Sequence, residues 1–158
     1  MITLTKVHVV ISLIAIFSGL VVAFGMLTNQ RLDRWTVLFL ASTLATSLTG
    51  FLFPFNGVTP GIVVGIISIV VLAIAIFARY KAQLAGASRW LYVISAIVAL
   101  YLNVFVLVAQ LFQKVPALKA LAPTQTEAPF AAAQLVTLIL FVVIAVFATL
   151  RFRPAGLH

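Results

Sequence analysis

Long apolar runs separated by short polar segments dominate the pattern along this chain. Each run is about as long as the roughly 20 residues that a helix needs to cross the ~30 Å hydrocarbon core of a bilayer. The pattern therefore predicts an all-α membrane protein, a bundle of five transmembrane helices in a single domain covering residues 1–158. The predicted helices cover residues 7–27, 35–53, 60–78, 90–112 and 130–150.

Composition agrees with this class. Of the 158 residues, 65% are hydrophobic and 8% are charged, whereas soluble domains carry about 25% charged residues. Cysteine is absent, which excludes disulfides and thiolate metal sites. The longest connection, residues 113–129, contains Pro116, which predicts a short amphipathic helix lying in the membrane interface.

The basic residues lie at the ends of the apolar runs and predict the orientation. Five crossings gather seven Lys and Arg residues at one side and three at the other. Cytoplasmic loops carry the excess of positive charge, so we expect the N-terminus outside and the C-terminus in the cytoplasm. The net charge of +8 is explained in this way, and no nucleic-acid partner is expected. The seven are Arg31, Arg34, Arg79, Lys81, Arg89, Arg151 and Arg153; the three are Lys6, Lys114 and Lys119.

Short internal matches raise the question of a duplication. Arg-Trp pairs stand at residues 34–35 and 89–90, and the sequences IAIFA and IAVFA at residues 74–78 and 144–148. Two parallel helical hairpins after a leading helix would explain them, but an Arg-Trp pair at an interface and short apolar matches also arise by chance. Small residues at four-residue spacing, Ala15, Gly19 and Ala23 and the pair Gly61 and Gly65, predict faces where helices pack closely.

Four polar residues of the second and fourth predicted helices form a candidate intramembrane site: Thr46, Ser47, Asn103 and Gln110. Asn103 lies near the middle of its helix, where an amide without a partner costs several kcal/mol. We expect it to bond Thr46 or Ser47 between helices, or to bind a ligand. The hydroxyls alternatively bond the carbonyl groups one turn earlier in their own helix.

A second candidate cluster lies at the predicted outer face and contains His8, Lys114, Glu127 and Gln134. A pair of His8 and Glu127 would suit proton relay or ligand orientation. The alternative is that His8 anchors the first helix while Glu127 is solvated. Asp33, which stands beside Arg31 and Arg34, is expected to form a solvated surface pair.

The sequence contains no catalytic motif and no metal-binding motif. A haem held by two histidines within the chain is excluded, because the second histidine is the terminal His158. We therefore expect no catalytic residues, no metal and no cofactor.

Residues 49–60 and 100–130 are similar to segments of small bacterial integral membrane proteins that carry no functional name. The resemblance implies the inner membrane of a bacterium and assigns no site residue or activity. The leading hypothesis is a non-enzymatic accessory subunit or small oligomer, with membrane lipids and a homo-oligomer or larger membrane complex as partners. The alternative is a carrier or binder of a small or lipophilic molecule, held in a polar intramembrane pocket.

Overall fold

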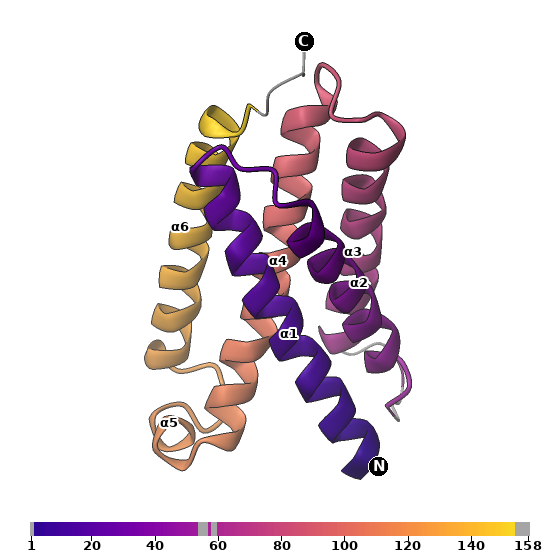
Figure 1. Ribbon diagram of the computed structural model, residues 1–158. Helices are drawn as coiled ribbons and strands as arrows, with labels where there is room; N and C mark the ends of the chain where they lie inside the picture. The colour runs from indigo at the N-terminus through magenta and orange to yellow at the C-terminus, as the bar shows by residue number, and fades with distance from the viewer. Residues whose placement is uncertain (1, 54–56, 58–59, 154–158) are drawn as a thin grey trace.

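The protein folds into a bundle of long helices (Figure 1). The computed structural model describes residues 2–53, 57 and 60–153, and these residues contain no β-strand. The helices are α1 (Ile2–Leu27), α2 (Asp33–Gly50), α3 (Pro60–Ile76), the π-helical turn η1 (Phe77–Lys81), α4 (Ser88–Lys114), α5 (Pro116–Leu121) and α6 (Ala128–Arg151). The short α5 confirms the helix predicted to begin at Pro116.

Four helical segments are long and apolar enough to cross a membrane: Thr3–Leu27, Gly61–Lys81, Ser88–Lys114 and Ala128–Arg151. The described residues confirm the predicted all-helical class, and these four segments are candidate membrane-spanning helices. Helix α2 is not among them, because it begins with Asp33 and Arg34 and is rich in Ser and Thr. The predicted count of five crossings is therefore not established by length and composition alone.

Helix α4 lies at the centre of the bundle and packs against α1, α3 and α6. Helix α2 packs mainly against α1 and α3. The turns 28–32 and 82–87 and the end of α6 gather at one end of the bundle, at the top of Figure 1. The N-terminus and α5 lie at the opposite end. We call the end with the two turns the basic end, since its residues include the seven cations predicted to share one side.

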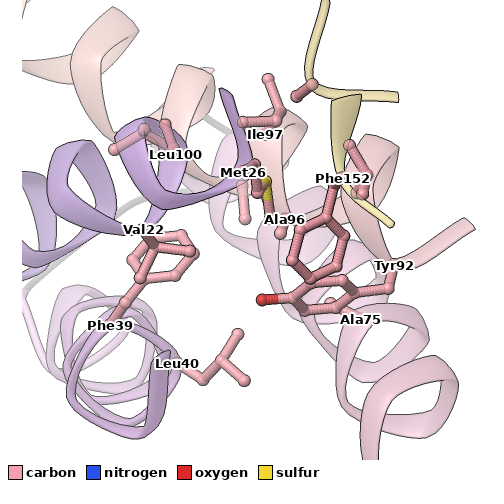
Figure 2. Close-up of a cluster of buried hydrophobic side chains, with 14 of the residues drawn as sticks. Val22, Met26, Phe39, Leu40, Ala75, Tyr92, Ala96, Ile97, Leu100 and Phe152 are labelled. Carbon is pink, nitrogen blue, oxygen red and sulfur yellow. The ribbon is translucent and has the colours of Figure 1, made fainter. Parts of the chain in front are cut away.

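The core forms where α1 and α2 meet α4. Figure 2 shows Val22 above the ring of Phe39, and Met26 beside Ala96. Close approach depends on the predicted small-residue row of α1, in which Ala15 is 0% and Ala23 is 4% exposed.

Gly19, in the middle of this row, has no room for a side chain. A Cβ there would lie 2.6 Å from Leu100 Cδ1 and 2.8 Å from Phe39 Cε1. These contacts confirm the row as a packing face. The second predicted face differs: Gly65 lies under the ring of Phe51, but Gly61 is exposed.

Candidate functional site

Asn103 is buried in the middle of α4 and is bonded to α2. Its Nδ2 donates to Oγ1 of Thr43 at 3.2 Å, and Thr43 is 0% exposed. The sequence predicted Thr46 or Ser47 as the partner; the structure corrects this to the threonine one helical turn earlier in α2. The amide thus bonds another helix of the bundle, as expected for a polar group at this depth.

The other members of the predicted intramembrane site are not joined to Asn103. Thr46 Oγ1 donates to the backbone oxygen of Ser42 at 2.8 Å, and Ser47 is buried. Gln110 is half-buried two turns further along α4, about 10 Å from Asn103 along the helix axis. No hydrogen bond links Gln110 to Thr46 or Ser47 among the described residues.

Most hydroxyls of the long helices bond their own backbone. Ser18 and Ser42 donate to carbonyl oxygens four residues earlier, at 2.7 and 2.5 Å. Thr49, Ser95 and Thr137 do the same. These bonds satisfy polar groups without water, so a row of hydroxyls does not by itself indicate a water-filled pathway.

At the end opposite the basic end, His8 and Glu127 do not form the predicted His–carboxylate pair, because each is bonded to another residue. The ring Nδ1 of His8 lies 2.7 Å from Thr49 Oγ1, and its ring meets Phe53 edge-on at 5.3 Å between centroids. His8 therefore fastens α1 to the end of α2.

Glu127 accepts hydrogen bonds within the turn that precedes α6. Its Oε1 accepts hydrogen bonds from the Oγ1 and backbone N of Thr124 at 2.7 and 3.1 Å, and Oε2 accepts from the backbone N of Thr126. The hydrogen bond from the Thr124 hydroxyl is the main cause that lowers the pKa of Glu127 below its ordinary value.

The remaining predicted residues of this cluster lie apart. Gln134 Nε2 donates to the backbone oxygen of Phe105 at 3.2 Å, which joins α6 to α4. Its Oε1 is buried and has no hydrogen-bond partner within the described ranges. Lys114 is exposed at the end of α4. The residues of the predicted cluster therefore do not form one site: His8, Glu127 and Gln134 make separate contacts, and Lys114 is exposed.

The most unusual group, Arg79 in η1, was missed by sequence reasoning. Its side chain is 1% exposed, and Nη2 donates to Asp33 Oδ1 at 2.5 Å. The guanidinium also lies 5.1 Å from the ring centroid of Tyr92 and 5.8 Å from that of Tyr80. Asp33 is therefore not only the solvated surface partner of Arg31, 2.9 Å away, but also the counter-ion of a buried cation.

The local backbone explains how Arg79 becomes buried. A π-helical turn adds a residue to the helix and rotates the side chains that follow it. The turn at Phe77–Lys81 brings Ala78 and Arg79 inside and leaves Tyr80 exposed. Arg79 Nη1 has no hydrogen-bond partner among the described residues. The sequence did contain a hint of this pair, because Asp33 is the single acidic residue on the side to which seven Lys and Arg residues were assigned.

Other contacts hold the basic end together. Arg89 Nη1 donates to the backbone oxygens of Thr149 and Phe152, both at 2.8 Å, and so satisfies carbonyl groups at the end of α6. The backbone N of Arg153 donates to Asn29 Oδ1 at 2.7 Å. Figure 2 shows the Phe152 ring against Tyr92, with centroids 6.0 Å apart. The end of α6, the 28–32 turn and the start of α4 are therefore linked.

These features define an all-helical chain with four candidate membrane-spanning helices and a tightly connected basic end. No family model matches the chain, and no curated protein or solved structure is found to be similar to it. Among the described residues, no three His, Cys, Asp or Glu side chains lie close enough to hold a metal ion. The resemblance to small bacterial membrane proteins therefore remains an expectation from the two segments that suggested it.

Proposed function

We propose that this chain is a multi-pass integral membrane protein without catalytic activity, acting as an accessory subunit or a small homo-oligomer. The observation that carries the proposal is the unequal burial of its spanning helices. In the 18-residue apolar segments of α1 and α4, 44% of the residues are buried, whereas only 6% are buried in the corresponding segment of α6. Helix α6 packs one face against α4 and leaves most of its remaining surface open to lipid or to another helix.

The contacts of the polar residues also favour this function over a carrier with a polar pocket. The proposed carrier site at Thr46, Ser47, Asn103 and Gln110 has less support because Asn103 already bonds Thr43. Both acidic residues are already engaged by other groups of the chain, since Asp33 is bonded to Arg79 and Glu127 to its own turn.

In this proposal α2 is the fifth crossing. Its 18 residues extend about 27 Å, close to the thickness of the hydrocarbon core. The basic end faces the cytoplasm of a bacterial cell, with the N-terminus outside, because seven of the ten cations fall on that side.

Single cysteines test the topology, because the natural chain has none. Gly86→Cys marks the 82–87 turn, Leu52→Cys follows the end of α2, and Thr124→Cys precedes α6. We expect an impermeant maleimide to label Gly86→Cys only from the cytoplasmic side and the other two only from outside. Labelling of Leu52→Cys from the same side as Gly86→Cys would exclude a crossing by α2.

Cross-linking tests the role of α6. Val136 and Val143 are exposed on α6, with 65% and 45% of their surface accessible. Val70, which is 54% exposed on α3, provides a matched control position. We expect cysteines on α6, but not at position 70, to cross-link to a second copy or to another membrane protein in native membranes. A chain that remains monomeric and without partners in both membranes and mild detergent would refute the subunit proposal.

A further inference from the structure

An open apolar groove of about 250 Å³ runs between α2 and the end of α3. It is lined by Val37, Leu40, Ala41, Leu44, Ile76 and Tyr80. Sites for drug-sized ligands usually enclose about 300–1,000 Å³ and contain a few converging polar groups. This groove is smaller and apolar, which suits a narrow hydrocarbon chain better than a rigid polar ligand.

The lining residues of α2, from Val37 to Leu44, extend about 10 Å along the helix. Val37, Ala41 and Leu44 follow one another at spacings of four and three, so they form one stripe along α2. Arg34 stands three residues before Val37 and continues the stripe toward the basic end. From Arg34 to Leu44 the helix rises about 15 Å, which is half of the ~30 Å hydrocarbon core.

Two exposed cations, Arg34 and Lys81, stand close in sequence to lining residues of the groove, Arg34 three residues before Val37 and Lys81 next to Tyr80. Arg34 and Lys81 are exposed, and neither has an ion-pair partner in the part of the chain that the structure describes. The neighbouring Asp33 carboxylate adds little repulsion because it is paired with both Arg31 and Arg79. The end of the groove is thus suited to an anion at headgroup depth.

Arg79, whose charge is paired with Asp33, lies behind the lining residue Tyr80. Its guanidinium carbon lies 5.8 Å from the ring centroid of Tyr80, which forms part of the lining. Its Nη1 is a buried donor without a partner among the described residues. Trp35, 38% exposed beside Arg34, is of the residue type enriched at the membrane–water interface. Apolar lining below and cationic groups above are the two parts of a phospholipid site.

We infer that an anionic phospholipid binds here, with one acyl chain in the α2–α3 groove and its phosphate beside Arg34. The inference rests on the proposed crossing of the membrane by α2. It goes beyond that proposal because it assigns a specific lipid class to one surface of the bundle. Ala41 lets the acyl chain lie close to the helix, and Arg34 selects the anionic headgroup.

Native mass spectrometry of the full chain released from nanodiscs of phosphatidylglycerol and phosphatidylcholine tests the site. The wild-type protein is expected to retain phosphatidylglycerol in preference to phosphatidylcholine. Arg34→Gln should weaken retention of phosphatidylglycerol about fivefold, corresponding to the ~1 kcal/mol that one Lys or Arg contributes near anionic lipids. The matched control is Arg151→Gln at the end of α6, which should retain the lipid as the wild type does.

Ala41→Phe fills the groove and should abolish preferential retention, while Ala132→Phe, at an exposed position of α6, should not. Should Ala41→Phe fail to fold by circular dichroism, Val37→Phe fills the same groove from a side chain that is 55% exposed. Equal retention by all variants, or equal retention of the two lipids, would overturn the inference. So would a dimer that Ala41→Phe dissociates, since a second copy would then occupy the groove. If Leu52→Cys is labelled from outside while one of these results is obtained, the lipid site is refuted and the proposed crossing by α2 is retained.

Discussion

Removing the negative charge of Asp33 should destabilise the bundle more than removing the cation that it neutralises. Asp33→Asn preserves shape but leaves the guanidinium of Arg79, 1% exposed, without its counter-ion. Arg79→Met removes the buried charge and leaves a carboxylate whose side chain is 69% exposed and therefore remains hydrated. Because only the first change leaves a charge buried, the two partners of one ion pair should respond unequally.

The magnitude follows from the contacts of Asp33. A hydrogen bond to a charged group contributes ~1.5–3 kcal/mol and a neutral one ~0.5–1.5, so loss of the charge costs about 1–1.5 kcal/mol. Asp33 is also the first residue of α2, where a negative charge adds ~0.3–1 kcal/mol. We therefore expect Asp33→Asn to cost about 2 kcal/mol. This value lies below the ~3–5 kcal/mol of fully buried pairs, because water reaches the carboxylate.

Reversible unfolding by titration with dodecyl sulfate in mixed micelles, followed by circular dichroism, measures these free energies. Arg31→Gln is the matched control, since its exposed pair with the same carboxylate should contribute at most ~1 kcal/mol. Arg79→Met should cost about 1 kcal/mol or less, because hydrophobic replacement of a buried charge is often neutral. Equal costs for Asp33→Asn and Arg31→Gln, both near zero, would refute the buried counter-ion.

Three further results are expected. Gly19→Ala should destabilise the bundle by ~1–3 kcal/mol through overpacking, whereas Gly50→Ala, whose nearest new contact is 3.6 Å away, should not; similar unfolding curves would contradict this. Asn103→Leu should cost ~0.6 kcal/mol and not more than ~1.7, as interhelical hydrogen bonds do in membranes, and a larger loss would indicate a further partner. Thr124→Ala should raise the pKa of Glu127, because the threonine hydroxyl bonds the charged form. The turn that the Glu127 carboxylate stabilises is fully formed above the ordinary pKa of Glu127 and is lost as the pH falls through the lowered pKa of the folded protein. In Thr124→Ala this loss should therefore begin at a higher pH. An unchanged NMR titration of the Glu127 carboxyl group would contradict the prediction.

The sequence predicted those features that depend on neighbouring residues. Apolar runs located α1, α3, α4 and α6, and Pro116 located α5. The structure begins α1 at Ile2 rather than residue 7 and ends α2 at Gly50 rather than residue 53. Helix α1 begins earlier because its backbone hydrogen bonds remain satisfied before the apolar run, whereas α2 ends at Gly50 because the backbone N–H groups of Phe51 and Leu52 bond carbonyl oxygens only three residues earlier.

Features that depend on distant residues could not be predicted in this way. The pair of Arg79 and Asp33 joins positions 46 residues apart, and the π-helical turn that buries Arg79 has no distinctive composition. Asn103 was recognised as a buried amide, but its partner Thr43 depends on the offset between α4 and α2. Periodicity specifies which face of a helix is polar, whereas the offset is determined by packing of particular side chains such as Leu100 and Phe39 around Gly19.

The hydropathy of α2 is too low for it to count as a candidate membrane-spanning helix, although its hydrogen bonds are compatible with a crossing. A hydropathy scale penalises each hydroxyl as if it required water, but Ser42, Thr46 and Thr49 each donate to a carbonyl oxygen of α2 itself. In the proposed crossing, Asp33 and Arg34 lie at the first turn, where headgroups and water solvate them. Without these two residues the helix extends about 24 Å, and a shortfall of ~6 Å against the hydrocarbon core is accommodated by local thinning of the bilayer or by snorkelling side chains at a modest cost per Å. The polar composition of α2 is therefore compatible with a crossing, provided that its faces remain packed against α1, α3 and α4.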